Sequence, residues 1–328
     1  MTDFVGLSVA EQAQAWSEVS GDRRPRITTD WEALDAVLPL GGLRPGSLVA
    51  IAGRTHTRKT AVAINLTANL LKQEVPVLFA GLDEDVATYT VKLASAFTGI
   101  PHTDLGNREP VSAYTSQAER FTLTRGHRPS MEQLSAILEI ADLGPSGLRP
   151  RVVFIDYLTL LYRDQYAGQD VVRVPRLMED LKVWAGDEEV VCFVLHQVGR
   201  ADEGGPHLRN HGHKLGTLES MKYGGEEAVD VLLYTSRPEL DPLGNMDEDE
   251  ARANRGKDFD LEDWQEAQHR VETNRDVTVL QLLKNRGGTR LCHAGIRLRS
   301  IGESQKMVPA DQMITSQGLR ALPDLENA

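Results

Sequence analysis

Short apolar runs recur along this chain, and most of them end at a glycine or a polar residue. Continuous runs of this kind predict strands that are buried on both faces of a parallel sheet. Amphipathic stretches with helical spacing follow several of the runs. The alternation predicts an α/β fold in which helices flank a mostly parallel central sheet. We expect strands at 47–52, 75–80, 152–155, 190–195 and 229–234, and helices at 61–72, 86–97, 172–185 and from Ser130, where Gln133 completes a capping box.

The last apolar runs predict a C-terminal β-hairpin with strands at 277–283 and 291–298. Lys284 and Arg286 follow the first of these strands and stand two residues apart. Side chains at that spacing project from the same face of a strand, so we expect the two cations to act as one unit. A charged insertion at 238–276 precedes the hairpin and is expected on the outside of the fold.

The domain organisation follows from where the globular pattern begins and ends. One short amphipathic stretch, near residues 9–19, interrupts an otherwise polar N-terminal segment. It predicts a helix that packs either on a neighbouring subunit or on its own domain. We expect an N-terminal extension over 1–26, one large domain over 27–304 and a polar C-terminal tail over 305–328.

Composition adds limits to this picture. The 328 residues are 41% hydrophobic and 26% charged, as in an ordinary soluble protein, and no apolar run is long enough to span a membrane. The net charge of −12 argues against a surface coated with basic residues, but leaves room for a local basic channel. The first residues do not resemble a secretory signal. Cys192 and Cys292 lie in apolar runs and indicate buried thiols in a reducing, cytoplasmic compartment, rather than a disulfide.

Residues 53–60 carry the strongest chemical signal. They follow an apolar run, open into a helical pattern and match G-x-x-x-x-G-K-[ST] at all but one position. Such a loop turns its backbone N–H groups toward phosphates, its lysine brings charge to the terminal phosphates, and its last hydroxyl binds Mg²⁺. The sequence therefore predicts a nucleotide site formed by Gly53, Arg54, Thr55, His56, Thr57, Arg58, Lys59 and Thr60.

Arg58 stands where the pattern has its second glycine. Either this backbone position adopts its conformation with a side chain present, or the loop is altered. An arginine directed at phosphates would also be electrostatically sensible.

Polar residues at the ends of three expected strands are further candidates. In a doubly wound sheet the carboxyl ends of the strands meet beside the phosphate loop. Asp83 or Glu84 is placed to activate water, although an acidic turn that caps the next helix is the alternative. Asp156 is placed to hold Mg²⁺ with Thr60, because hard cations prefer oxygen ligands. Gln197 can contact the γ-phosphate, or merely end its strand.

The segment 198–217 is rich in glycine and histidine. Its histidines lack further ligands at metal spacing, so we do not expect a zinc site. We expect a locally basic loop whose cations, Arg200, Arg209 and Lys214, meet nucleic-acid phosphates.

With these residues in place, the sequence resembles the ATPase domain of the DnaB-like replicative helicases, a branch of the RecA-fold motors, from about residue 27 to 298. The motifs that carry the resemblance are Gly42-Leu43-Arg44-Pro45-Gly46, Leu82-Asp83-Glu84, Ile155-Asp156-Tyr157-Leu158, His196-Gln197-Val198-Gly199-Arg200 and Lys284-Asn285-Arg286. Three features depart from the family: Arg58 replaces glycine, His196 replaces serine, and the N-terminal domain used for collar formation and primase contact has no counterpart.

The resemblance implies a hexameric ring that binds ATP and Mg²⁺ between subunits. Lys59 and Thr60 would hold phosphates and metal, and Asp156 would hold the metal's water shell. Asp83 matches the family's catalytic glutamate, with Glu84 as the substitute. Lys284 and Arg286 would enter the neighbour's site as the arginine finger and its companion. Loops after Tyr157 and Gln197 would grip single-stranded DNA, and a primase or loader would be a partner.

Three functions compete at this stage. The first is a ring-forming, ATP-driven DNA translocase of helicase type, phage-encoded or from a phage-like element. The second is a non-motor RecA-fold ATPase, either a recombination mediator or a nucleotide-gated assembly or regulatory protein. The departures at Arg58 and Asp83 favour the second. A structural protein with an inactive site is disfavoured, because Lys59, Thr60 and Asp156 are all present.

Overall fold

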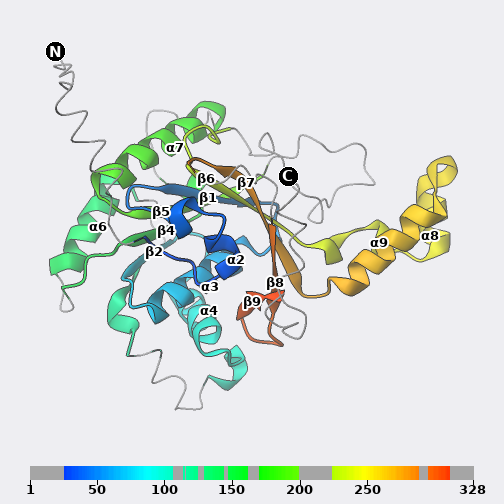
Figure 1. Cartoon of the computed structure of the whole chain (residues 1–328), viewed down its shortest axis with the longest axis horizontal. Helices are drawn as coiled ribbons and strands as arrows, with labels where there is room; N and C mark the ends of the chain where they lie inside the picture. The colour runs from blue at the N-terminus through cyan, green and yellow to red at the C-terminus, as the bar shows by residue number, and fades with distance from the viewer. Residues whose placement is uncertain are drawn as a thin grey trace.

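The structure is a computed structural model of the chain. It describes residues 26–105, 114, 116–124, 129–143, 147–161, 170–198, 224–287 and 295–310. These residues build one nine-stranded sheet in the order β3-β2-β4-β5-β1-β6-β7-β8-β9 (Figure 1). The strands from β3 to β6 are mutually parallel, and β7, β8 and β9 are antiparallel. The predicted α/β architecture with a C-terminal hairpin is confirmed.

The five apolar runs form strands within one or two residues of their expected bounds. They are β1 (Leu48–Gly53), β2 (Val77–Gly81), β4 (Val152–Asp156), β5 (Val191–Gln197) and β6 (Val231–Ser236). β3 (Phe121–Thr124) lies in a segment for which the sequence predicted no strand. Its residues are half-buried, since it is the edge strand beside β2, so it lacks the continuous apolar run that marks the central strands.

Helices cover both faces of the sheet, and side chains alternate between the two layers along each strand. In β1, Val49 and Ile51 pack with α3 and α4, whereas Leu48 and Ala50 pack with α6 and α7. The larger helices are α3 (Lys59–Lys72), α4 (Val86–Thr98), α6 (Met131–Leu143) and α7 (Asp170–Asp187). Shorter ones are α2 (Glu32–Asp35), η1 (Pro39–Gly41), η2 (His102–Asp104), η3 (Ala118–Arg120) and η4 (Leu158–Leu160). At the start of α6 the Ser130 N–H donates to Gln133 Oε1 and the Gln133 N–H to Ser130 Oγ, so the capping box is confirmed.

The antiparallel strands are β7 (Val277–Asn285), β8 (Gly295–Ser300) and β9 (Met307–Pro309). β9 pairs with β8, so the sheet extends past residue 304, where we expected the domain to end. Asn65 of α3 fixes this last strand, because its Oδ1 accepts from the Met307 N–H at 2.7 Å and its Nδ2 donates to Gln305 O at 2.8 Å. Those contacts join segments 240 residues apart and leave no signal in the local sequence.

The charged insertion forms an arm, residues 238–276, that extends away from the sheet (Figure 1). It consists of η8 (Pro238–Leu240), η9 (Leu243–Asn245), α8 (Glu248–Arg255), η10 (Gly256–Asp258) and α9 (Leu261–Thr273). The arm starts after β6 and returns into β7, so both of its ends lie at the sheet.

Cys192 is a fully buried free thiol in β5, and burial raises its pKa well above the ordinary value. Cys292 lies outside the described residues. In the part of the chain that the structure describes, no helix has both the length and the apolar character needed to cross a bilayer.

Candidate nucleotide-binding site

A cavity of about 320 Å³ lies where β1, β2, β4 and β5 end. Its lining residues come from four strand ends and the start of α3, and they are Thr55, His56, Arg58, Lys59, Thr60, Asp83, Asp156, Tyr157 and Gln197. The structure therefore brings together eight of the residues that the sequence singled out, from positions up to 142 residues apart. This edge of a parallel sheet is where doubly wound folds bind their ligands.

The phosphate loop, residues 53–60, begins at Gly53, where only glycine fits. A Cβ on Gly53 would lie 2.2 Å from Thr235 Oγ1 and 2.6 Å from Thr57 Oγ1. Thr57 is fully buried, and its hydroxyl contacts Arg54 O at 2.7 Å and Thr235 Oγ1 at 2.8 Å. Thr57 thus shapes the loop from beneath, with its side chain against β6 rather than toward the cavity.

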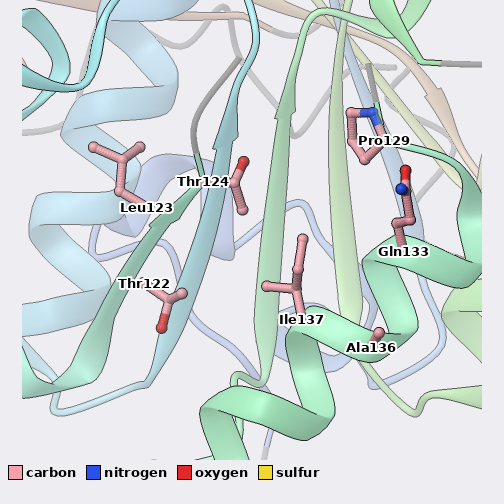
Figure 2. A pocket seen from close by; sticks show the side chains of 7 residues that line it. All are labelled: Thr122, Leu123, Thr124, Pro129, Gln133, Ala136 and Ile137. Carbon is pink, nitrogen blue, oxygen red and sulfur yellow. The ribbon is translucent and has the colours of Figure 1, made fainter. Parts of the chain in front are cut away.

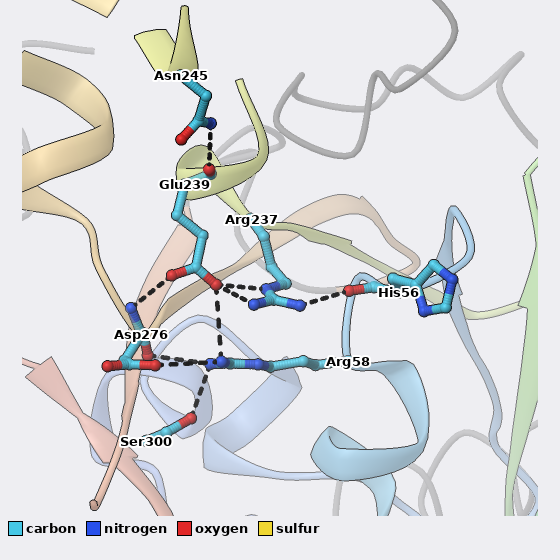
Figure 3. A network of polar contacts seen from close by, with 7 residues as sticks. All are labelled: His56, Arg58, Arg237, Glu239, Asn245, Asp276 and Ser300. Atoms are coloured by element: carbon cyan, nitrogen blue, oxygen red, sulfur yellow. Dashed lines mark hydrogen bonds and ion pairs between the residues drawn. The ribbon is translucent and has the colours of Figure 1, made fainter. Parts of the chain in front are cut away.

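Arg58 adopts the left-handed conformation, with φ 66° and ψ 29°, so the backbone accepts a side chain where the pattern has glycine. The electrostatic alternative placed its guanidinium at the phosphates. The structure instead holds the guanidinium at Ser300, Asp276 and Glu239. Figure 3 shows it pointing to the base of the arm, by which we mean Glu239 and Asp276 of the arm with the adjoining Arg237 and Ser300. There Nη1 donates to Ser300 Oγ at 2.7 Å and to Asp276 O at 3.1 Å. Nη2 also lies 3.6 Å from Glu239 Oε1.

Lys59 begins α3, and its ammonium folds over the loop. Nζ donates to Gly53 O at 2.9 Å and to Arg54 O at 2.7 Å. Burial lowers the pKa of Lys59 to about 8, although Asp156 and Asp83 oppose the change. A nearby polyanion would favour the charged ammonium, so this lysine suits a phosphate ligand.

Thr60 and Asp156 meet in front of β4. Thr60 Oγ1 donates to Asp156 Oδ2 at 2.9 Å, and Tyr89 Oη donates to the same oxygen at 2.9 Å. Asp156 is 3% exposed, and burial raises its pKa to about 6 despite these two hydrogen bonds. A half-buried hydroxyl beside a buried carboxylate fits Mg²⁺, which takes a few protein oxygens and completes its shell with water and phosphate.

The three acidic residues of the turn after β2 make different contacts. Asp83 lines the cavity, and its charge raises the pKa of both Lys59 and Asp156. Glu84 instead forms an ion pair with Lys92 at 2.5 Å. Asp85 is the N-cap of α4, where it accepts from the Thr88 N–H at 2.9 Å. The geometry therefore favours Asp83 over Glu84 as the group that faces a bound nucleotide.

Gln197 ends β5 beside the loop, where its Nε2 donates to Thr55 Oγ1 at 3.0 Å. The contact joins the strand that leads into the 198–217 segment to the phosphate loop. Arg200, Arg209 and Lys214, the expected contacts to nucleic acid, and the histidines of that segment lie outside the described residues.

Lys284 and Arg286 lie at the amino ends of the parallel strands, and the phosphate loop lies at their carboxyl ends. In the pairing of β6 with β7, Asn285 stands opposite Val231 at the start of β6, whereas Gly53 pairs with Thr235 near its end. Lys284 Nζ donates to Glu226 O and Glu227 O, at 2.7 and 3.0 Å. Arg286 Nη2 donates to Glu227 O at 2.9 Å. Neither cation reaches the site of its own chain.

A second cavity, of about 490 Å³, lies between β3 and α6 (Figure 2). It is lined by Thr122, Leu123, Thr124, Pro129, Gln133, Ala136 and Ile137. None of these side chains carries a charge, so the cavity lacks the cations that a triphosphate requires. The smaller cavity at the phosphate loop is the better nucleotide site.

Sequence reasoning missed two side chains at the site. Tyr89 is 2% exposed and donates to Asp156, and Thr235 is fully buried against the phosphate loop. Tyr89 falls in an amphipathic helix and Thr235 near the end of an apolar run, which are positions that ordinary core residues also occupy. Only the packing of α4 and β6 beside β1 and β4 gives them a role.

The fold and the site together define a RecA-like domain with a phosphate loop. A family model described as the DnaB-like helicase C terminal domain matches residues 26–211, which is more than half of the chain. The chain therefore belongs to the DnaB-like helicase C-terminal domain family.

Similar proteins agree with that assignment. The replicative DNA helicase DnaB of Pasteurella multocida (strain Pm70) is 24% identical over 229 residues, which cover 65% of this chain and 47% of the relative. The DnaB of Rickettsia typhi (strain ATCC VR-144 / Wilmington) is 25% identical over 260 residues, which cover 72% and 50%. The chain thus spans about half the length of the curated relatives it matches.

Solved structures show the same fold. One solved ATPase domain superposes with a TM-score of 0.66 at 17% identity, over 93% of this chain and 99% of that one. A structure of a DnaB-like replicative helicase and its interactions with primase gives 0.64 at 17% identity, over 93% and 67%.

Proposed function

We propose that this protein is an ATP-driven, ring-forming DNA translocase of helicase type that acts on single-stranded DNA. The observation that carries the proposal is the convergence of Lys59, Thr60, Asp83 and Asp156 on one cavity at the carboxyl ends of parallel strands. These groups supply a cation for phosphates, two oxygens for Mg²⁺ and a carboxylate for water.

Each residue has a separate task in hydrolysis. Lys59 leaves the loop carbonyls and holds the β- and γ-phosphates. Thr60 and Asp156 hold Mg²⁺, which when bound withdraws negative charge from the phosphates. Asp83 orients a water molecule toward the γ-phosphate and accepts its proton. Gln197 contacts the γ-phosphate and transmits its presence to the segment that follows β5.

A neighbouring copy completes the site. Lys284 and Arg286 lie at the edge of the sheet that cannot serve the phosphate loop of the same chain. In a ring, that edge faces the next subunit's nucleotide, where Arg286 acts as the arginine finger and Lys284 as its companion. A hexamer is the assembly we propose, with Arg200, Arg209 and Lys214 toward the DNA in its pore.

ATP hydrolysis with and without single-stranded DNA tests the proposal. DNA should stimulate hydrolysis, and a forked duplex should be unwound. Mixing Lys59→Ala with Arg286→Ala should restore part of the turnover that each variant lacks, because one active interface then forms between an intact Lys59 and an intact Arg286. Full hydrolysis by a single copy, or neither binding nor stimulation by DNA, would contradict the motor.

The second candidate is a non-motor RecA-fold ATPase, such as a recombination mediator or a regulatory assembly protein. It is favoured by Asp83, which is shorter by one methylene than glutamate and so reaches less far into the cavity. Slow hydrolysis that follows oligomer assembly, with no strand separation, would support it.

For the motor, a primase or a loader is the partner we propose, and the cytoplasm is the location.

A further inference from the structure

The phosphate loop is attached to the base of the arm on both sides of Thr57. On one side, Arg58 reaches Ser300, Asp276 and Glu239 with its guanidinium. On the other, Arg237 Nη1 donates to His56 O at 3.0 Å. His56 and Arg58 both have a positive φ, which residues other than glycine rarely adopt. The loop thus holds two unusual backbone conformations that contacts from the arm's base support (Figure 3).

Glu239 and Asp276, near the two ends of the arm, join these contacts into one network. Glu239 Oε1 accepts from Arg237 Nε at 2.8 Å, and Glu239 Oε2 accepts from the Asp276 N–H at 2.8 Å. Arg58 lies between the same two carboxylates, 3.6 Å from Glu239 and 3.4 Å from Asp276. Its side chain is 20% exposed and that of Glu239 15%, so solvent screens the pair only in part.

The arm is packed as one unit above this network. A Cβ on Gly244 would lie 2.3 Å from Ala267 O, so η9 rests directly on α9. Trp264 Nε1 donates to Met246 O at 3.1 Å, which ties α9 to the segment before α8. Asp241, 5% exposed, lies 3.5 Å from Arg270. Because Glu239 Oε2 also accepts from the Asp276 N–H, a displacement of the arm that keeps this bond moves both residues.

We propose that Arg58 is a positioning residue that fixes the phosphate loop against the base of the arm, so that nucleotide affinity and the position of the arm are coupled. The inference rests on the proposed function, because it takes the loop as the nucleotide site. Glycine at this position would leave the loop without that attachment. Coupling is reciprocal: nucleotide stabilises the arm's base, and anything that displaces the arm weakens nucleotide binding.

Two substitutions separate this role from a direct effect of charge on phosphate. Arg58→Gly removes the contacts of the Arg58 guanidinium, keeps the left-handed backbone available, and leaves the Arg237 contact to His56 O in place. Glu239→Gln weakens the attachment but leaves Arg58 charged. If Arg58 acted by charge alone, Glu239→Gln would free that charge and tighten nucleotide binding. If it acts by position, both variants bind more weakly.

The measurement is the Kd of a fluorescent ADP analogue with Mg²⁺, with circular dichroism to establish that each variant folds. We expect each variant to raise Kd by about five- to twentyfold, and the double variant to add little, because both changes break one network. Glu248→Gln is the matched control: it breaks an ion pair with Arg252 within the arm and should leave Kd within about twofold.

Hydrogen exchange gives an independent readout of the coupling. ATP should slow exchange in peptides over 53–60, 237–241 and 274–278 of the wild-type protein. In Arg58→Gly the slowing should remain over 53–60 and be lost over 274–278, where Asp276 meets the guanidinium. Unchanged affinity in Arg58→Gly, or tighter binding in Glu239→Gln, would overturn the inference and leave the proposed function standing. Absence of nucleotide binding by the wild-type protein would overturn both.

Discussion

Replacement of Asp156 by asparagine should stabilise the protein when nucleotide and Mg²⁺ are absent. Burial raises the pKa of this carboxyl group from 3.8 to about 6, so the folded state holds the proton more tightly than the unfolded chain does. An acid of this kind weakens the fold as it ionises. At about 1.4 kcal/mol per pKa unit, ionised Asp156 costs about 3 kcal/mol of folding free energy above pH 6. An uncharged amide can still accept from Thr60 and Tyr89.

The sign of the effect fixes its pH dependence. Well below the unfolded pKa of 3.8 the carboxyl group is protonated in both states and costs nothing. The loss of stability develops between the unfolded pKa of 3.8 and the folded value of about 6, and is complete above it. Asp156→Asn should therefore raise the free energy of unfolding by about 3 kcal/mol at pH 7.5, and by about half as much at pH 5.

Urea unfolding in EDTA at these two pH values is the assay. Asp249→Asn, an exposed aspartate on α8, is the control and should change stability by no more than about 0.5 kcal/mol at either pH. A loss of stability in Asp156→Asn at pH 7.5, or an equal gain at both pH values, would refute the reasoning. Hydrolysis of ATP should be lost in the same variant, so the charge would be retained for function at the expense of stability.

Three further substitutions test the site. Lys59→Ala should abolish ATP hydrolysis in a colorimetric phosphate assay, and retained turnover would show that the cavity is not the catalytic site. Gly53→Ala should lower the free energy of unfolding by about 1–3 kcal/mol, because its Cβ would meet Thr235 Oγ1 at 2.2 Å; an unchanged urea midpoint would contradict the packing. Tyr89→Phe removes one donor from Asp156 and should raise the Mg²⁺ concentration needed for half-maximal hydrolysis by about three- to tenfold. An unchanged Mg²⁺ requirement would show that Tyr89 does not position the carboxylate.

The arm shows what local sequence predicts and what it does not. Thirteen Asp and Glu residues against five Lys and Arg in 238–276 account for a net charge of −8, most of the −12 of the whole chain. That excess predicts a solvent-exposed segment, because so many charges cannot be buried. It does not predict that Glu239 and Asp276 contact the phosphate loop, since those contacts join residues 181 and 218 positions away in the chain.

The sequence by itself determined the central sheet, the phosphate loop and the carboxylates at the strand ends. Continuous apolar runs can be satisfied only by burial on both faces, and the carboxyl ends of parallel strands must share one edge, so these features follow from local pattern and chain direction. Tertiary structure alone decided which acidic residue faces the cavity, where the guanidinium of Arg58 points, and that Tyr89 and Thr235 belong to the site. The physical reason is that each of these outcomes depends on a partner supplied by a distant segment, whose position is set by packing rather than by its neighbours in the chain.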